Sequence, residues 1–243
     1  MNLPYLRMEL LRMLRNRKVL VLSVIMPAIL LLIFGGMSRG QRLAGVDGAA
    51  FVMVGMALFG SMSAAVNNGG TIAVERGLGW NRQLRLTPLR PGWYATSKVI
   101  VSLVMALPPL LVSYLVGALV LGVRLRPAVW AGVLAGSWLA ALPFAALGLV
   151  VGYLARPDGV QAVSGLLYLL LAGLGGLWVP VENMPAAVRD LAALTPAYWA
   201  GEVARAPLHP GGLSVGAVLA VAAWTLGLAA IGVLRCRADT TLA

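Results

Sequence analysis

The sequence predicts an all-α polytopic membrane protein with six transmembrane helices. Of its 243 residues, 60% are hydrophobic and 11% are charged, whereas soluble domains average about 25% charged residues. The mean hydropathy is +0.88. Six apolar runs are each near or above the roughly 20 residues that a helix needs to cross a bilayer. Composition and run length together exclude a soluble globular domain.

Residues 3–18 precede the first apolar run and are predicted to form an amphipathic helix. One apolar stripe recurs at helical spacing: Leu3, Leu6, Leu10, Met13 and Leu14. Basic side chains lie on the other side, a pattern typical of a helix in the membrane interface. A charged tail that only sets topology is the alternative. The following run is too long for a signal peptide core and lacks a clear cleavage site, so we expect it to be retained as a span.

The chain is predicted to be a single transmembrane domain, residues 1–243. Its expected spans are Val19–Met37, Ala49–Val74, Ser97–Val123, Ala128–Leu154, Val160–Val179 and Leu213–Leu234. Prolines interrupt three of them, at Pro27, at Pro108-Pro109 and at Pro143, and are expected to kink the helices. The apolar cores hold no ionisable side chain, with Lys98 at an edge, which argues against an ion-coupled carrier. Asn67 and Asn68 are expected to hydrogen-bond between helices or reach water.

The distribution of basic residues predicts the orientation of the spans. With the N-terminus inside, 13 of the 19 lysines and arginines lie on the inner side and 6 on the outer side. Short loops with an excess of lysine and arginine stay in the cytoplasm. Both termini are therefore expected to be cytoplasmic.

A polar stretch from Val74 to Lys98 separates the second and third spans. Five of its six charged residues are basic. Glu75 and Arg76 are expected to leave the second span where water begins, and Glu75 to pair with Arg76, with Arg82 or with a partner protein. Trp80 and Leu84 stand four apart and share one helical face, which suggests that a protein docks there. A solvated loop that only fixes topology is the alternative.

This stretch resembles the coupling loop of a known family. Glu75-Arg76-Gly77, followed by Leu84-Arg85-Leu86-Thr87-Pro88-Leu89, is similar to the loop between the second and third spans of ABC-2 type transporter permeases. These are membrane subunits of bacterial ATP-driven exporters, including antibiotic-resistance exporters. The resemblance implies a cytoplasmic coupling helix that sits in a groove of an ATPase subunit. It assigns an ATPase-coupling role to Glu75, Arg76, Gly77, Trp80, Leu84 and Arg85.

The segment between the fifth and sixth spans is the longest one on the outer side. Pro185 can open a short helix, and Thr195-Pro196 can cap and open a second. The segment also resembles the ABC-2 family, in which short re-entrant helices cap the outer end of the pathway. The resemblance implies an outer gate made of Trp178, Pro180, Glu182, Pro185, Tyr198 and Trp199. An ordinary interfacial loop is the alternative.

Several kinds of site are excluded by the sequence. A phosphate-binding loop needs Gly-Lys-Ser/Thr, but the only lysines, Lys18 and Lys98, are each followed by valine. With Cys236 as the only cysteine and His209 as the only histidine, the chain can form no internal disulfide and no paired-histidine metal site. We therefore expect no enzyme activity, no metal and no cofactor on this chain, with ATP and Mg²⁺ bound by a partner subunit.

The resemblance implies the membrane permease of an ABC exporter. We expect two copies of an ABC ATPase subunit and a second permease chain, identical or homologous, in a bacterial cell membrane. The uncharged spans favour a hydrophobic or amphipathic substrate, such as a drug, a natural product or a lipid. The net charge of +11 suits lipid head groups and a cytoplasmic partner rather than nucleic acid. A secondary transporter and a non-transporting membrane scaffold are the alternatives.

Overall fold

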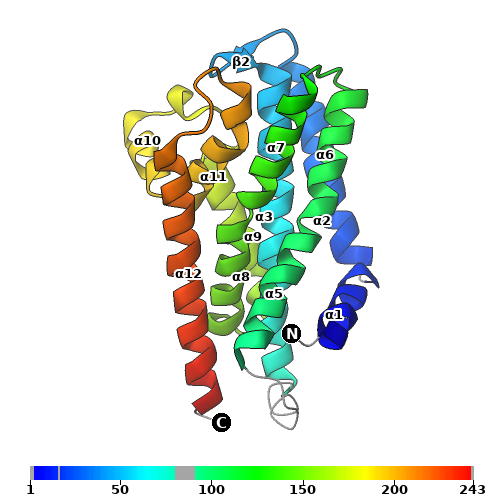
Figure 1. Ribbon diagram of the computed structural model, residues 1–243, viewed down its shortest axis with the longest axis vertical. Coiled ribbons are helices and arrows are strands. Elements are labelled where there is room, and N and C mark those ends of the chain that lie inside the picture. Colours follow the sequence, from blue (N-terminus) through cyan, green and yellow to red (C-terminus); the bar gives the residue numbers. More distant parts are fainter. Residues whose placement is uncertain (1–2, 16, 80–90, 242–243) are drawn as a thin grey trace.

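The computed structural model describes residues 3–15, 17–79 and 91–241, and this part of the chain is mostly helical (Figure 1). Its helices are α1 (Leu3–Arg15), α2 (Arg17–Leu30), α3 (Gly48–Gly77), α5 (Pro91–Met105), α6 (Leu107–Leu119), α7 (Pro127–Leu139), α8 (Leu142–Leu154), α9 (Val160–Leu174), α10 (Ala186–Ala193), α11 (Pro196–Arg205) and α12 (Val215–Thr241). Shorter pieces are a π-helical turn at Leu31–Gly35, 3₁₀ turns at Val181–Asn183 and Ala206–Leu208, and two antiparallel strands, β1 (Arg42–Leu43) and β2 (Val46–Asp47).

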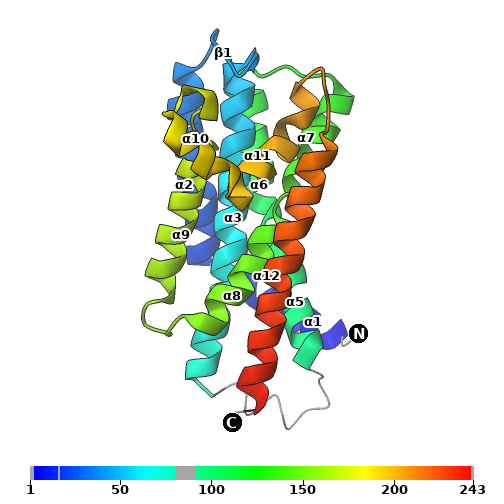
Figure 2. The ribbon, with the colours of Figure 1, turned by 90° about the vertical axis from the view of Figure 1, so that its left-hand side faces the viewer.

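The long helices run side by side along one axis, as a polytopic membrane protein requires (Figures 1 and 2). Four stretches of the described chain are long and apolar enough to cross a membrane: Gly48–Gly77, Gly92–Leu119, Pro127–Leu154 and Val215–Arg237. Ser23–Gly35 and Val160–Leu174 are also apolar helices, but they are shorter than the roughly 20 residues of a full span. The mostly helical, multi-pass architecture is confirmed, and the count of six spans stays a prediction.

Prolines interrupt two of the long stretches where the sequence predicted it. Pro108 sits at the start of α6, just after the break at Ala106. Pro143 sits at the start of α8, after the break at Ala140–Ala141. A proline has no N–H to donate and its ring clashes with the carbonyl four residues earlier, so a helix preferentially restarts at this position. Pro27 lies inside α2, and a π-helical turn follows that helix.

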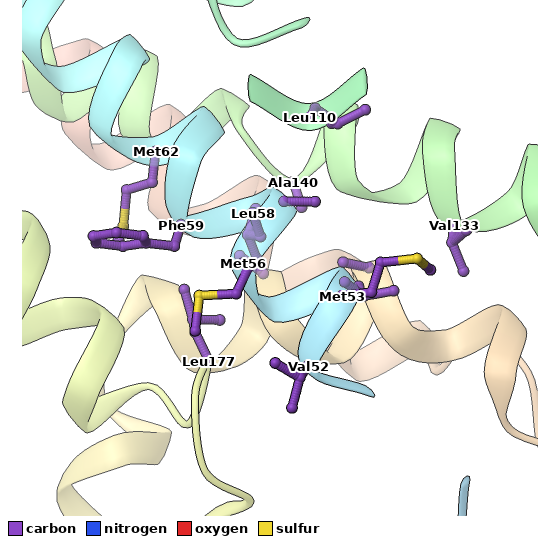
Figure 3. Close-up of a cluster of buried hydrophobic side chains, with 14 of the residues drawn as sticks. Val52, Met53, Met56, Leu58, Phe59, Met62, Leu110, Val133, Ala140 and Leu177 are labelled. Atoms are coloured by element: carbon purple, nitrogen blue, oxygen red, sulfur yellow. The ribbon is translucent and has the colours of Figure 1, made fainter. Parts of the chain in front are cut away.

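Helix α3 forms the centre of the bundle. The most apolar 18 residues of its span are entirely buried inside the protein, and α2, α5, α6, α8 and α9 all contact it. Figure 3 shows Met53, Met56 and Phe59 of α3 among side chains from neighbouring elements, including Leu110 and Leu177. In a bilayer, a helix enclosed by other helices can carry polar side chains because their hydrogen bonds are made inside the protein.

Close approach of α3 and α8 depends on three glycines. A Cβ atom on Gly69 would lie 2.2 Å from the backbone carbon of Gly148, and one on Gly152 would lie 2.3 Å from the carbonyl oxygen of Gly69. Small residues let membrane helices approach closely enough to pack backbone against backbone. Glycines four residues apart are frequent by chance in a glycine-rich chain, but Gly148 and Gly152 are needed for the close packing of α8 against α3.

Helix α1 lies at the same end of the bundle as the C-terminus (Figure 1). Its apolar stripe packs against α5: Leu6, Leu10 and Met13 contact Val101 and Met105. The stripe predicted to face the membrane interface thus faces another helix of the protein. This contact holds α1 beside the end of α3 where the candidate coupling segment begins.

Candidate functional site

The first half of the predicted coupling segment lies in the last turn of α3. Glu75, Arg76 and Gly77 end this helix. The other three predicted residues, Trp80, Leu84 and Arg85, lie outside the described residues. The structure therefore describes this site at the C-terminal end of α3, where the candidate coupling segment begins.

Glu75 is buried, with only 2% of its surface exposed. Its Oε1 accepts hydrogen bonds from Lys98 Nζ at 2.7 Å and from Arg12 Nη1 at 2.9 Å. The hydroxyl of Tyr94 donates to its Oε2 at 2.6 Å. The expectation that Glu75 stands where water begins is wrong, because α1 and α5 cover it and supply its partners.

Lys98, which donates to Glu75, is itself fully buried. Its ammonium group donates to Glu9, to Glu75 and, at 3.2 Å, to the hydroxyl of Thr71. We call the set Glu9, Arg12, Glu75, Tyr94 and Lys98 the Glu75 cluster. It holds two carboxylates and two cations, so its formal charge is zero.

The Glu75 cluster joins three helices that are far apart in sequence. Glu9 and Arg12 belong to α1, Glu75 to α3, and Tyr94 and Lys98 to α5. Taking a charge out of water costs several kcal/mol, which is offset only when each charge is paired and its hydrogen bonds are made. Each carboxylate here contacts Lys98, and Glu75 also has Arg12 and Tyr94. The pairing therefore holds all three helices together.

Sequence reasoning missed Glu9 and Tyr94 and placed Lys98 only at the edge of a span. One signal could have found Glu9. It is the only acidic residue before Asp47, and it stands three residues after Leu6 and four before Met13, on the apolar stripe of α1. An acid on the apolar face of a helix indicates a buried cation opposite, and Lys98 was the one lysine beside an apolar run other than Lys18.

Arg76 and Gly77 contact a different part of the protein. Arg76 Nη1 donates to the carbonyl oxygen of Tyr153 at 2.7 Å, and its guanidinium lies 5.8 Å from the centre of the Tyr153 ring. A basic side chain on the last carbonyls of a helix is a favourable C-terminal cap. A Cβ on Gly77 would lie 2.6 Å from Pro157 Cγ. The last turn of α3 thus contacts α1 and α5 through Glu75, the end of α8 through Arg76, and the α8–α9 turn through Gly77.

Asn68 lies two turns above Glu75 on α3 and is buried. Its amide nitrogen donates to Ser102 Oγ at 2.8 Å and to the carbonyl oxygen of Lys98 at 3.3 Å. The predicted hydrogen bond between helices is confirmed for Asn68. It adds a second polar contact between α3 and α5.

The outer segment forms two short helices, α10 and α11. Pro185 is the N-terminal cap residue of α10. The hydroxyl of Thr195 accepts a hydrogen bond from the backbone N–H of Tyr198 at 3.3 Å, and Pro196 opens α11. The predicted cap at Thr195-Pro196 is confirmed. Its geometry satisfies one of the backbone donors that every helix start leaves free.

The six predicted gate residues do not form one group. Pro180, Glu182 and Tyr198 line a cavity of about 380 Å³ between α3, α11 and the start of α12. Trp178 points elsewhere and packs edge-on against Phe59 at 5.4 Å between ring centres. Trp199 donates from its indole nitrogen to the carbonyl oxygen of Ala193 at 2.8 Å, which caps α10. Only the first three share a space that a ligand can enter.

Arg205 also lines this cavity and was not predicted. It is 5% exposed, and its Nη2 donates to the carbonyl oxygens of Gly176 at 3.1 Å and Leu177 at 2.9 Å. Its guanidinium carbon lies 3.8 Å from the centre of the Phe51 ring. Burial lowers the pKa of Arg205 to about 10, and the nearby carboxylates of Glu202 and Glu182 oppose this shift. Arg205 stands seven residues after Tyr198, so the two residues share one face of α11. This spacing could have placed Arg205 beside the predicted gate residue Tyr198.

The chain is similar to a known protein family and to a curated relative. A family model described as ABC-2 type transporter matches residues 5–208. The "Putative transport permease YvfS" of Bacillus subtilis (strain 168) is 31% identical over 196 residues, which cover 79% of this chain and 79% of that protein. Residues 5–208, which the family model matches, include most of α1, the end of α3 and both α10 and α11.

Proposed function

Because the chain belongs to the ABC-2 type transporter family, we propose that it is the membrane permease of an ATP-driven exporter. A permease of this family is a non-enzymatic membrane subunit that works with an ABC ATPase. The sequence has no Gly-Lys-Ser/Thr motif, which supports ATP and Mg²⁺ binding on a separate subunit. We further propose two ATPase copies and a second permease chain, identical or homologous.

The Glu75 cluster is the observation that carries this proposal. The coupling segment departs from the last turn of α3, where Glu75 is tied to α1 and α5 and Arg76 to the end of α8. A force applied to the segment reaches four helices through these contacts, because a packed core moves as discrete rigid elements rather than deforming continuously. Closure of an ATPase dimer against the segment would thus tilt several spans together.

In this proposal Trp80, Leu84 and Arg85 contact the ATPase, while Glu75, Arg76 and Gly77 transmit the movement. The burial of Glu75 supports the division, since a side chain that is 2% exposed has no surface left for a second protein. Helix α1 and the C-terminal end of α12 lie at one end of the bundle (Figure 1), which agrees with the proposed cytoplasmic termini in a bacterial cell membrane.

We propose a hydrophobic or amphipathic substrate, because a cavity in the inner half of the bundle has mostly apolar walls. A second cavity, of about 260 Å³, opens there between α1, α2, α3, α5 and α9, and Ala64, Met105, Asn67 and Gln161 are among its lining residues. Arg12 is the one charged residue among those that line it. Ligand pockets of this kind combine apolar walls with a few polar groups that orient the ligand.

Co-expression with an ABC ATPase encoded beside this chain tests the proposal. We expect the two proteins to co-purify, the permease alone to hydrolyse no ATP, and the complex to export an amphipathic dye from vesicles in an ATP-dependent way. Trp80→Ala and Leu84→Ala should weaken co-purification at least fivefold, as loss of an apolar interface contact of about 1 kcal/mol or more does. Leu194→Ala, which truncates an exposed apolar side chain directly after α10, is the matched control.

Two results would overturn the proposal. One is ATP turnover by the permease free of any other protein. The other is dye transport driven by an ion gradient without an ATPase, which would favour a secondary transporter. Normal transport with normal ATPase binding in both apolar variants would reduce the Val74–Lys98 stretch to a loop that sets topology.

A further inference from the structure

The outer cavity contains charges of both signs. Glu182 and Glu202 line it together with the hydroxyl-bearing Tyr198, and Arg205 lies at its buried side. Both carboxylates are on exposed residues. Among the ion pairs of the described residues, none joins Arg205 to either carboxylate. In the described part of the chain, the positive and the negative groups of the cavity are therefore not paired directly with each other.

Arg205 has unused hydrogen-bonding capacity. Its Nη2 is occupied by the carbonyl oxygens of Gly176 and Leu177, but its buried Nε has no partner. A guanidinium presents its donors in a planar fork that matches the two oxygens of a carboxylate or phosphate. A buried donor left unpaired costs free energy, so an anionic group in the cavity beside Arg205 stabilises a guanidinium that the protein's own groups do not fully satisfy.

Space for this guanidinium is provided by two glycines. A Cβ on Gly55 would lie 2.8 Å from Arg205 Nη2, and one on Gly201 would lie 3.1 Å from Nη1. Phe51 covers one face of the guanidinium plane at 3.8 Å. These contacts fix the orientation of Arg205, and a fixed donor loses less conformational entropy when it binds a ligand.

We propose that this cavity is a binding site for a zwitterionic head group that carries a phosphate or carboxylate close to a primary ammonium. The anion would accept from Arg205. The ammonium would donate to Glu182, Glu202 and the hydroxyl oxygen of Tyr198. A volume of about 380 Å³ is at the lower end of the roughly 300–1,000 Å³ of ligand pockets, which suits a head group rather than a whole lipid.

The surroundings of the cavity indicate that its ligand is an amphiphile. Ser214 lines the cavity, and its neighbours Leu213 and Val215 are 55% and 75% exposed. Large exposed apolar side chains at the start of a membrane span face lipid. A head group in the cavity can thus keep its acyl chains beside α12. The inference concerns binding and holds whether or not the chain is an exporter.

Lipid adducts on the purified full-length chain, counted by native mass spectrometry, test the site. The probes are phosphatidylethanolamine, phosphatidylcholine, which has no ammonium hydrogens, and phosphatidylglycerol, which has no cation. We expect the ethanolamine lipid to bind up to about fivefold more tightly than phosphatidylglycerol, because a lost exposed ion pair lowers affinity by up to that factor. It should also bind more tightly than phosphatidylcholine, whose cation cannot donate hydrogen bonds to the two carboxylates. Soluble phosphoethanolamine is the fourth probe: displacement of the lipid at similar concentration identifies a free zwitterion as the ligand, and its failure to compete identifies the lipid.

The variants Glu182→Gln and Glu202→Gln, singly and together, should remove the preference for the ethanolamine lipid. Asp190→Asn changes an exposed acid on α10 that does not line the cavity, and it should keep the preference. Equal binding of the three lipids together with no binding of phosphoethanolamine by the unmodified chain would overturn the proposal, as would a preference that survives the double substitution. In that case water molecules, and not a head group, hydrogen-bond to Arg205 in the cavity.

Discussion

At the scale of single residues, Glu75 combines a charge with almost complete burial. Its partners Lys98, Arg12 and Tyr94 come from two other helices, so its contribution to folding depends on all of them. The sequence predicts that Glu75 stands where water begins, and an ion pair exposed to water contributes only about 0–1 kcal/mol. Burial reverses that expectation, because removing one partner leaves an unpaired charge inside the protein.

Glu75→Gln is the substitution that tests this role, since it keeps the size of the side chain and removes its charge. We expect a cost of about 3–5 kcal/mol, typical of a broken buried ion pair, seen as a melting temperature lower by roughly 5 °C or more in detergent. The double variant Glu75→Gln/Lys98→Met removes both charges and should lose less than the two single variants combined. Asp158→Asn should melt like the unmodified chain. A Glu75→Gln protein with unchanged melting temperature would show that the cluster contributes no stability.

At the scale of helices, the contact between α3 and α8 decides how tightly the centre of the bundle packs. Gly69, Gly148 and Gly152 let the two backbones meet without side chains between them. The same two helices carry Glu75 and the carbonyl that Arg76 caps. Spacing between α3 and α8 therefore also sets the geometry of the candidate coupling site.

Gly69→Ala should separate these helices. The added methyl group would overlap the backbone of Gly148, at 2.2 Å, which flexible side chains cannot relieve, and overpacking of this kind costs about 1–3 kcal/mol. Gly227→Ala is the matched control within α12, where a Cβ meets nothing within 4 Å, and alanine there favours the helix by up to about 1 kcal/mol. Thermal unfolding should show a lower midpoint for the first and an equal or higher one for the second. The reverse order would mean that α3 and α8 are not in close contact in the membrane.

At the scale of the whole molecule, the arrangement of helices implies two distinct aqueous ends. Helix α1, the C-terminal end of α3 and the α8–α9 turn lie toward one end, and α10 and β1 lie toward the other (Figure 2). Basic residues concentrate at the first end, which predicts that it is cytoplasmic. The two proposed sites are then on opposite sides of the membrane.

Cysteine labelling in intact cells tests this orientation. Cys236 is the only cysteine and is buried, so Cys236→Ser provides a silent background. Asp158→Cys, in the α8–α9 turn, should react with a membrane-impermeant maleimide only after the cells are opened. Asp190→Cys, on α10, should react from outside. Both aspartates are exposed, and labelling with the opposite sidedness would invert the topology.

The sequence by itself determined which segments are apolar helices, where prolines interrupt two of them, and where Thr195 caps α11. These features depend on hydropathy, on the missing N–H of proline and on one side chain within three residues, all of which are local. The family followed from a local pattern as well, Glu75-Arg76-Gly77 with Thr87-Pro88, and the match over residues 5–208 confirmed it.

Only the tertiary structure decided what those residues contact. Glu9 and Lys98 are 89 residues apart, Arg12 and Glu75 are 63 apart, and Arg205 lies 28 residues from the carbonyl of Leu177 that it binds. No periodicity pairs residues at such separations, because the pairing depends on how whole helices pack. Whether a charge faces water or a buried partner is likewise a property of the assembled bundle, since the cost of burial is offset only by groups that other helices bring to it.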